Sequence, residues 1–288
     1  MIIEYKYIDK PRITYWTIEK IVDAQRSGLR EVYVTLDLGR SYKTAKINSN
    51  GVIVDNYVLG RDLLKSVKPG FVYEVVDNNL KPIIKRGRNG FYKLKPVSEK
   101  DAPTIEINGI HMHRIIDITP WKDSYFKVRD ARVKRGNIVL DTCMGLGYTA
   151  IHSLRQGARQ VYTVEVDENV IEIAMHNPWS RELESSNILV FKDDITDLIH
   201  SFNDSYFDRI IHDPPRFSGR TGDLYSLELY KEFYRVLKPG GILYHYTGEP
   251  GRHRGASIVK GIGKRLERAG FITRFSRRSL GYLCYKHS

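Results

Sequence analysis

Residues 139 to 147 read VLDTCMGLG, and this stretch decides the fold class. An apolar strand ends at an aspartate, and a loop with two glycines follows before a helical pattern begins. Glycine lets the backbone approach a ligand closely at a helix N-terminus. The three-glycine pattern of pyrophosphate-binding loops is not matched, so the loop alone is compatible with an adenosine-type cofactor without a phosphate or with a strand-to-helix turn that binds no ligand. The candidate cofactor contacts here are Asp141, Thr142, Met144, Gly145 and Gly147.

Strands and helices alternate from about Arg135 onward. The strand-like runs are NIVLDTC, QVYTVEV, ILVFK, FDRIIHD, GILYHY, FITRFS and GYLCYK. Helical patterns fall between them, at residues 149–156, 168–175, 195–202, 224–237 and 256–268. This alternation predicts a mostly parallel, doubly wound α/β sheet. The last two strands are joined by too few residues for a crossover helix, so we expect them to pair antiparallel.

Acidic residues also follow the next two strands. Glu165 comes 24 residues after Asp141, where a carboxylate can accept hydrogen bonds from both ribose hydroxyls of an adenosine. Val166 lies beside it. Asp194 and the backbone of Ile195 are placed to hold the adenine edge. Either acid could instead be a solvated loop residue, and Asp194 could cap the helix that begins at Ile195.

Over residues 135–288 the sequence resembles the class I S-adenosylmethionine (SAM) dependent methyltransferases. DTCMGLGYT is similar to the DPFxGSGT-type loop of amino-methyltransferases, and LYKEFYRVLKPGGILYHY resembles the helix and fifth strand of the class. The resemblance implies SAM as cofactor, bound by the loop after Asp141, by Glu165 and by Asp194. It also implies a doubly wound sheet with an antiparallel last strand.

The run FDRIIHDPPRF predicts the catalytic strand end. Asp213, Pro214 and Pro215 resemble the D/N-P-P-Y/F motif of enzymes that methylate planar amino nitrogens. Hydrogen bonds from the amine to the carboxylate and to the Pro214 carbonyl would aim the nitrogen lone pair at the methyl group. An aromatic residue normally follows directly, but Arg216 stands there and Phe217 comes one position later. Phe217 could still stack on a base, Arg216 could stack or pair with phosphate, or the substrate could be no base at all.

The first 103 residues predict a small β-rich domain that binds substrate, with residues 104–288 as the methyltransferase domain. Residues 1–100 carry a net charge of +8 and residues 252–288 carry +9, whereas the middle carries −5. Basic ends favour a polyanionic partner, since each phosphate that is neutralised releases counterions. A merely soluble basic surface is the alternative. Asn50-Gly51 and Asn108-Gly109 each predict a tight hairpin, and residues 81–103 predict a linker or an exposed basic hairpin.

Other features bound the class of protein. No run of about 18 apolar residues occurs and no signal peptide is recognised, so we expect a soluble, cytoplasmic protein without membrane contact. Cys143 and Cys284 are too few for a disulfide framework or a cysteine zinc site. His111 and His113 lack a third ligand in sequence reach, so we expect no metal.

These patterns favour an RNA methyltransferase that acts on an exocyclic amine, cytidine N4 or guanosine N2, in ribosomal or transfer RNA. The whole chain resembles predicted archaeal methyltransferases of this layout. Tyr125 and Phe126 could close over the cofactor or contact the substrate. Two alternatives stay open: an aminopropyltransferase that uses decarboxylated SAM, and a non-catalytic RNA-binding or assembly factor. The basic C-terminal residues argue against the first alternative, which needs an acidic pocket for a polyamine.

Overall fold

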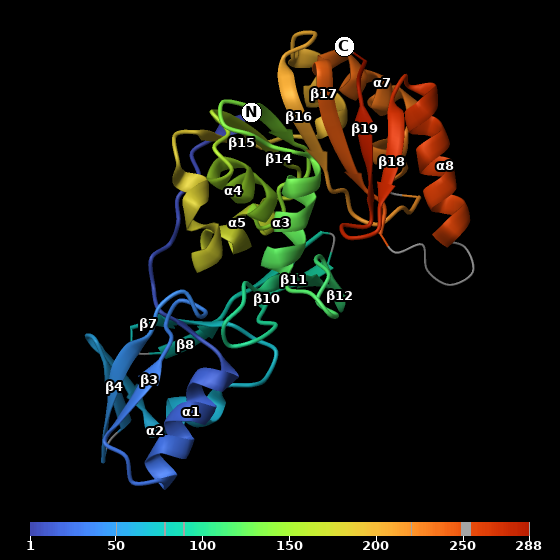
Figure 1. Cartoon of the computed structure of the whole chain (residues 1–288). Coiled ribbons are helices and arrows are strands. Elements are labelled where there is room, and N and C mark those ends of the chain that lie inside the picture. The colour runs from blue at the N-terminus through green and yellow to red at the C-terminus, as the bar shows by residue number, and fades with distance from the viewer. Residues whose placement is uncertain (50, 78, 89, 220, 249–254, 288) are drawn as a thin grey trace. The chain divides into compact units, whose positions relative to one another are not determined.

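The computed structural model describes residues 1–288 except 50, 78, 89, 220, 249–254 and 288. The chain divides into two compact units (Figure 1). The large-sheet unit comprises Met1–Tyr5, Lys122–Glu168 and Glu182–Ser288, and the N-terminal unit comprises Lys6–Trp121 and Asn169–Arg181. The predicted division at residue 103 falls inside the N-terminal unit, because the strand Thr104–Ile107 pairs with the strand Gly90–Lys95 of that unit.

The large-sheet unit is built on eight strands in the order β1-β15-β14-β13-β16-β17-β19-β18. Their bounds are β1 (Ile2–Ile3), β13 (Ile138–Asp141), β14 (Gln160–Glu165), β15 (Ile188–Lys192), β16 (Phe207–His212), β17 (Leu237–Tyr246), β18 (Ile272–Ser276) and β19 (Gly281–Tyr285). β13 pairs in parallel with β14 and with β16. β19 is antiparallel to both β17 and β18. The predicted doubly wound sheet with an antiparallel last strand is therefore confirmed.

Helices alternate with the strands, and five of them lie where the pattern of apolar residues predicts. They are α3 (Pro120–Asp130), α4 (Tyr148–Arg155), α5 (Glu168–Met175), α6 (Ile195–Leu198), α7 (Leu227–Val236) and α8 (Gly255–Arg268), with short 3-10 helices at η1 (Pro178–Glu184), η2 (Ile199–Ser201) and η3 (Gly222–Tyr225). Residues of α6, α7 and α8 form one apolar core with one face of the sheet. β13 is buried along its whole length, as expected for a central parallel strand. No helix among the described residues has both the length and the apolar character needed to cross a membrane.

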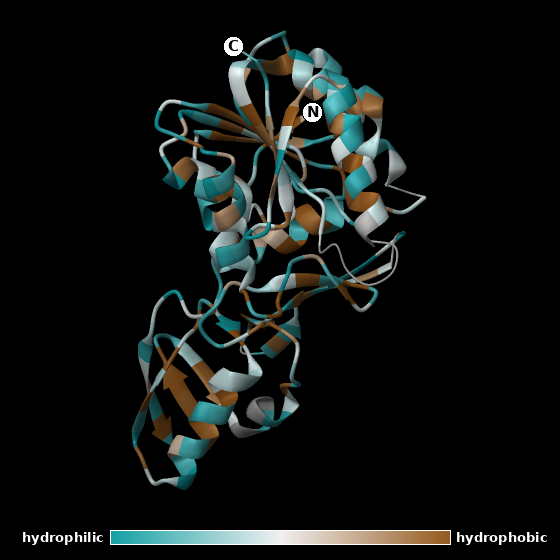
Figure 2. Ribbon diagram, turned by 45° about the vertical axis from the view of Figure 1, so that its right-hand side comes forward, coloured by the Kyte–Doolittle hydropathy of each residue, from teal (hydrophilic) through white to brown (hydrophobic). Residues whose placement is uncertain are grey.

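The described residues of the N-terminal unit form three small antiparallel sheets, as predicted for a β-rich region. Their orders are β3-β4-β5-β6, β2-β7-β8 and β12-β11-β10-β9. The bounds are β2 (Arg12–Ile13), β3 (Glu31–Val34), β4 (Lys43–Asn48), β5 (Gly51–Val54), β6 (Tyr57–Gly60), β7 (Tyr73–Val76), β8 (Asn79–Pro82), β9 (Ile84–Gly87), β10 (Gly90–Lys95), β11 (Thr104–Ile107) and β12 (Ile110–His111), with helices α1 (Tyr15–Arg26) and α2 (Arg61–Ser66). Figure 2 shows apolar residues along its strands, and Ile18 and Ile21 of α1 join their core.

The predicted hairpins are present. Asn108 and Gly109 have φ of 49° and 83°, the left-handed conformation that a two-residue hairpin turn between β11 and β12 requires. β4 and β5 also pair antiparallel, although Asn50 of the predicted turn lies outside the described residues. Within residues 81–103, β9 and β10 form a hairpin as one alternative predicted, but Tyr92 and Leu94 of β10 are buried, so it is not the exposed hairpin that was expected. The elements that were not predicted include β1, which pairs with β15, α3, which precedes the central strand, and η1.

Candidate active site

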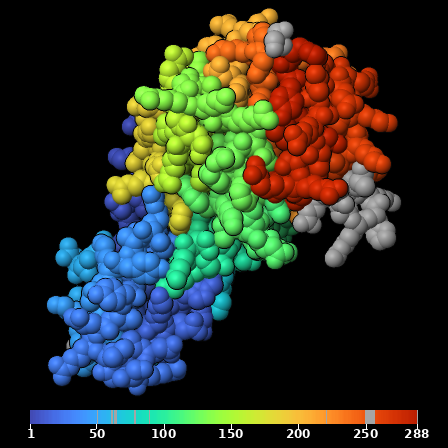
Figure 3. Space-filling model, viewed as in Figure 1, coloured from blue at the N-terminus to red at the C-terminus, as the bar shows by residue number. Residues whose placement is uncertain are grey.

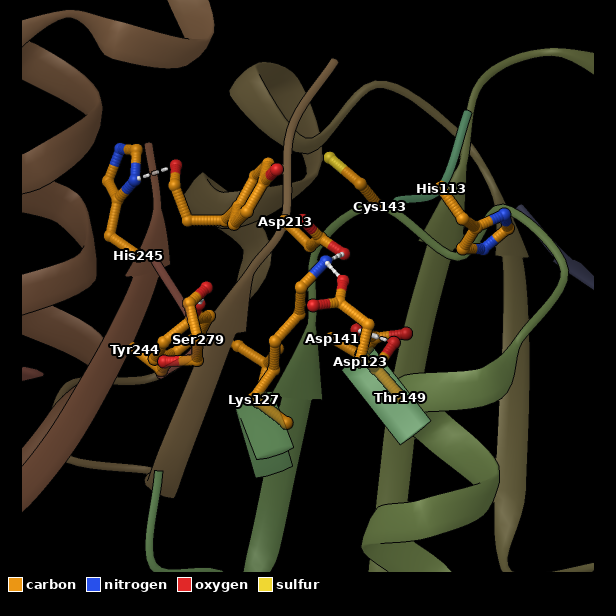
Figure 4. Close-up of polar contacts among 12 residues, drawn as sticks. His113, Asp123, Lys127, Asp141, Cys143, Thr149, Asp213, Tyr244, His245 and Ser279 are labelled. Atoms are coloured by element: carbon orange, nitrogen blue, oxygen red, sulfur yellow. Dashed lines mark hydrogen bonds and ion pairs between the residues drawn. The ribbon is translucent and has the colours of Figure 1, made fainter. Parts of the chain in front are cut away.

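Asp141 anchors the loop that follows the central strand. Its carboxylate is fully buried and accepts hydrogen bonds from Thr149 Oγ1 of α4, at 2.8 Å, and from Thr163 Oγ1 of β14, at 2.6 Å. Figure 4 shows the Asp141–Thr149 contact. Burial raises the pKa of Asp141 to about 7, against the opposing effect of the two threonine donors. The structure therefore gives Asp141 internal partners, and it ties the strand end to α4 and β14.

This buried carboxyl group makes a pH-dependent stability difference expected. A raised pKa in the folded state gives a stability contribution that is present at low pH and is lost as the pH rises through about 7. The free energy of unfolding of Asp141→Asn relative to the wild type should therefore increase by roughly 1–3 kcal/mol from pH 5 to pH 8. Urea unfolding across this range measures it. Asp197→Asn, at an exposed carboxylate, is the control. A difference between Asp141→Asn and wild type that stays flat with pH would contradict the assignment.

The two glycines of the loop have backbone conformations that suit glycine. Gly145 and Gly147 have φ of 55° and 76°. Gly147 is the N-cap of α4, and a Cβ there would lie 2.6 Å from the Leu183 side chain. The Gly145 amide donates to Glu165 Oε2 at 3.0 Å, and the Met144 amide donates to the carbonyl of Val164 at 2.7 Å. The loop is therefore fastened to β14 with its backbone close to the Glu165 carboxylate, as a cofactor cradle requires.

The predicted cofactor contacts after β14 and β15 differ in burial and in hydrogen-bond partners. Glu165 also accepts from the Asp167 amide at 3.0 Å, and burial raises its pKa to about 6. Val166 beside it is 63% exposed. Asp194 is the N-cap of α6 and accepts from the Thr196 amide at 2.8 Å, which is the capping role that the sequence left open. Ile195 is buried.

Asp213 directly follows β16 and is paired with a buried lysine. Lys127 Nζ of α3 lies 2.6 Å from Asp213 Oδ2 and 2.9 Å from Asp123 Oδ2, as Figure 4 shows. The side chains of Lys127 and Asp213 are 3% and 19% exposed, and Asp123 is fully buried. Lys127 Nζ also lies 4.1 Å from the centre of the Tyr246 ring. One ammonium thus serves two carboxylates at the end of the predicted catalytic strand.

Electrostatics keep this lysine charged. Burial disfavours the ammonium, but Asp213 and Asp123 outweigh that effect and raise the pKa of Lys127. Burial raises the pKa of Asp213, and the Lys127 ammonium opposes this shift. Sequence reasoning missed both Lys127 and Asp123. Their i,i+4 spacing in a helical segment was the available signal, but it does not identify a partner 86 residues away.

The two carbonyls of the proline pair differ in their partners. Tyr225 Oη donates to the Pro215 carbonyl at 2.7 Å. By contrast, no described residue donates a hydrogen bond to the Pro214 carbonyl or to Asp213 Oδ1. Phe217 is 48% exposed and its ring meets the Tyr225 ring edge-on at 5.3 Å. Arg216 is exposed. The motif therefore presents two acceptors, with an aromatic ring one position later than usual.

Behind the motif lie two neutral histidines. His212 Nε2 faces the Leu224 carbonyl at 2.8 Å and so carries its proton, while Nδ1 accepts from Thr142 Oγ1 at 2.6 Å. His245 Nε2 lies 2.7 Å from Tyr230 Oη. Burial lowers the pKa of His212 to about 4 and that of His245 well below its usual range. The His212 side chain therefore does not join Asp213, and it supports the cofactor loop through Thr142.

Tyr125 and Phe126 lie on α3, in the same helix as Lys127. The Tyr125 ring contacts the His152 ring edge-on at 5.5 Å, and its hydroxyl accepts from Arg129 at 3.0 Å. The Arg278 guanidinium lies 5.0 Å from the centre of the Phe126 ring. Both rings are partly exposed. Their predicted substrate role therefore stays a prediction.

Comparison with known sequences gives a domain match and a relative over nearly the whole chain. Residues 139–241 match the family described as a methyltransferase domain. The uncharacterized protein MJ1233 of Methanocaldococcus jannaschii is 42% identical over 273 residues, which cover 90% of this chain and 91% of that protein. Ribosomal RNA large subunit methyltransferase I of Aeromonas hydrophila is 25% identical over 232 residues. This alignment covers 74% of the chain but only 57% of the length of that enzyme.

Among solved structures, spermidine synthase from Thermotoga maritima aligns with a TM-score of 0.55 at 17% identity. The alignment covers 76% of this chain and 77% of that one. A likeness at this identity concerns the fold alone.

Proposed function

Because this chain is a class I SAM-dependent methyltransferase of the family that includes MJ1233, we propose that it methylates an exocyclic amino group of a base in structured RNA. Cytidine N4 or guanosine N2 in ribosomal or transfer RNA is the proposed target. The name of the Aeromonas relative supports ribosomal RNA, and the basic N-terminal and C-terminal residues support a polyanion.

The observation that carries the proposal is the pair of acceptors at the end of β16. Lys127 holds Asp213 through Oδ2, so Oδ1 can accept one N–H of the target amine. Tyr225 occupies the Pro215 carbonyl, and the carbonyl of Pro214 would accept the other N–H. Two acceptors favour a tetrahedral nitrogen whose lone pair points away from them. The exposed Phe217 ring, which packs edge-on against the buried Tyr225 ring, would stack on the base.

When bound, SAM would supply an electrophilic methyl group for the amine nitrogen, with the neutral thioether S-adenosylhomocysteine as the leaving group and the displaced N–H proton released to water. The chain's own contribution is to bind and orient. The backbone of residues 142–147 and the Glu165 carboxylate would hold the cofactor, with Val166, Asp194 and Ile195 near its adenine end. A target base inside a helix must also be flipped out, at a cost of a few kcal/mol.

The cofactor assignment predicts a pH-dependent affinity for SAM. The ionised Glu165 carboxylate accepts hydrogen bonds better than the neutral acid, so affinity should fall as the pH drops through about 6. Glu165→Gln should bind SAM about 10- to 100-fold more weakly at pH 8 and lose this pH dependence. Calorimetric titration measures both. Glu168→Gln, an exposed carboxylate paired with Lys192, is the matched control. Equal affinities of Glu165→Gln and wild type would remove Glu165 from the site.

The reaction is tested by incubating the full chain with methyl-labelled SAM and with ribosomal RNA from a strain that lacks this protein. The nucleosides are then analysed by mass spectrometry. One new N4-methylcytidine or N2-methylguanosine is the expected result. Absence of methyl transfer to ribosomal and to transfer RNA would refute the proposal. A second reaction, with putrescine and decarboxylated SAM, tests the aminopropyltransferase alternative. Lys127 disfavours it, because the lysine neutralises Asp213 where a cationic amine would need an acid.

A further inference from the structure

A basic cavity of about 500 Å³ lies in the large-sheet unit, apart from the cofactor loop. Its walls come from the end of α3 and the segment after it, from β18, from the turn at residues 277–280 and from β19. Five of its lining residues are exposed arginines: Arg129, Arg132, Arg274, Arg277 and Arg278. Figure 3 shows this part of α3 beside the C-terminal strands on the surface. A cluster of guanidinium groups such as this one favours the binding of an anion.

Asp130 is the acid among the lining residues, and its oxygens are already occupied. Its carboxylate is buried and accepts from Ser276 Oγ at 2.7 Å and from Ser279 Oγ at 2.5 Å, and it pairs with Arg278. In the part of the chain that the structure describes, none of the other four arginines pairs with a carboxylate. Asp130 therefore orders the wall of the cavity and pairs with Arg278, but it does not neutralise the other four arginines.

The cavity shares an edge of the sheet with the DPP motif. β18 runs parallel to β17, because both are antiparallel to β19, so the turn at 277–280 lies at the carboxyl end of these strands. The Thr247 amide donates to the Leu280 carbonyl at 3.0 Å, which fixes this turn to the end of β17. Along α3, Asp130 follows Lys127 by three residues, a separation of about 5–6 Å between Cβ atoms. The cavity thus lies about one helical turn from the partner of Asp213.

We propose that this arginine cavity binds backbone phosphates of the RNA strand that carries the target nucleotide. The inference rests on the proposed function, since it requires an RNA substrate. Guanidinium groups bind phosphate oxygens in a bidentate manner, and several together hold a strand without reading its bases. Arg278, held by Asp130 and lying over Phe126, gives the cavity one ordered cation next to an exposed ring. The cavity would position the strand while the DPP motif receives the base.

Neutralising two arginines tests the site. Arg274→Gln/Arg277→Gln should bind a short labelled oligocytidine about 10- to 30-fold more weakly at 0.1 M salt. The slope of log affinity against log salt should become shallower by about 1.4, as expected for two lost phosphate contacts on a single strand. Lys134→Gln/Arg135→Gln removes the same charge from exposed residues before β13, at the opposite edge of the sheet, and should leave both quantities unchanged. Affinity for SAM should be the same in all three proteins.

The outcomes separate the two proposals. If the wild type methylates ribosomal RNA but both double variants bind oligocytidine as it does, the cavity inference is overturned and the proposed function stands. Equal weakening of both double variants also overturns it, because the effect is then general charge. A wild type that neither binds oligocytidine nor methylates any RNA refutes the proposed function and the inference together. Polyglutamate bound as tightly as RNA, with the same loss in the cavity variant, would assign the cavity to acidic protein instead.

Discussion

Asp213→Ala should lower the rate of methyl transfer at saturating SAM and RNA by at least about 100-fold, with SAM affinity within a factor of about three of the wild type. The substitution removes Oδ1, the proposed acceptor for the target amine, and also one of the two carboxylates that Lys127 contacts. The loss should fall on the chemical step, since the phosphate-binding surface stays intact. Single-turnover transfer of labelled methyl to ribosomal RNA measures it.

Asp208→Ala is the matched control for this experiment. Asp208 belongs to the same strand but lies at its other end, where it pairs with Lys238 at 2.9 Å and accepts from the Ile138 amide at 2.7 Å. Its loss should lower stability and leave the rate of methyl transfer to RNA unchanged. If Asp213→Ala still transfers methyl within about threefold of the wild type, the DPP motif does not hold the target amine. Full function in that variant would favour the non-catalytic alternative.

The succession of strands, loops and helices in the large sheet could be predicted from the sequence, because each parallel strand is a short apolar run that ends in a polar or glycine-rich loop. Asp141 and Glu165 are the last residues of their strands, and Asp213 directly follows its strand. The carboxyl ends of these parallel strands share one edge of the sheet, so this placement can be predicted without knowledge of side-chain contacts. The antiparallel last strand followed from the length of one connection. Local pattern and chain connectivity therefore carry most of this fold.

The partners of those acids could not be predicted, because they depend on contacts distant in sequence. Nothing in the residue type distinguishes Asp141, which accepts from Thr149 and Thr163, from an acid that faces a ligand. The role of Asp194 as a cap was one of two readings that the sequence allowed. The greatest omission is Lys127: α3 is strongly charged, and its sequence does not reveal that one of its lysines is buried.

Lys127→Met should lower the free energy of unfolding by about 3–5 kcal/mol. The change leaves Asp123, which is fully buried, and Asp213 without the ammonium that compensates them, whereas methionine fills a similar volume. In the variant these carboxyl groups are stabilised in their neutral form, so their folded-state pKa values rise and its stability falls as the pH rises. The deficit against wild type should therefore be larger at pH 8 than at pH 5. Urea unfolding at the two pH values measures it.

Two further variants identify the cause of that loss. Lys122→Met changes an exposed lysine of the same helix and should shift the free energy of unfolding by no more than about 0.5 kcal/mol. Asp123→Asn/Lys127→Met also removes the Asp123 carboxylate that Lys127→Met leaves uncompensated, so the double variant should be more stable at pH 8 than Lys127→Met alone. The double variant can therefore be measured even if the single variant does not fold. A double variant no more stable than the single one would contradict the view that an uncompensated Asp123 carboxylate causes the loss. Recovery of stability without recovery of methyl transfer is expected, because Asp213 then still lacks the ammonium that holds Oδ2 and leaves Oδ1 to the amine.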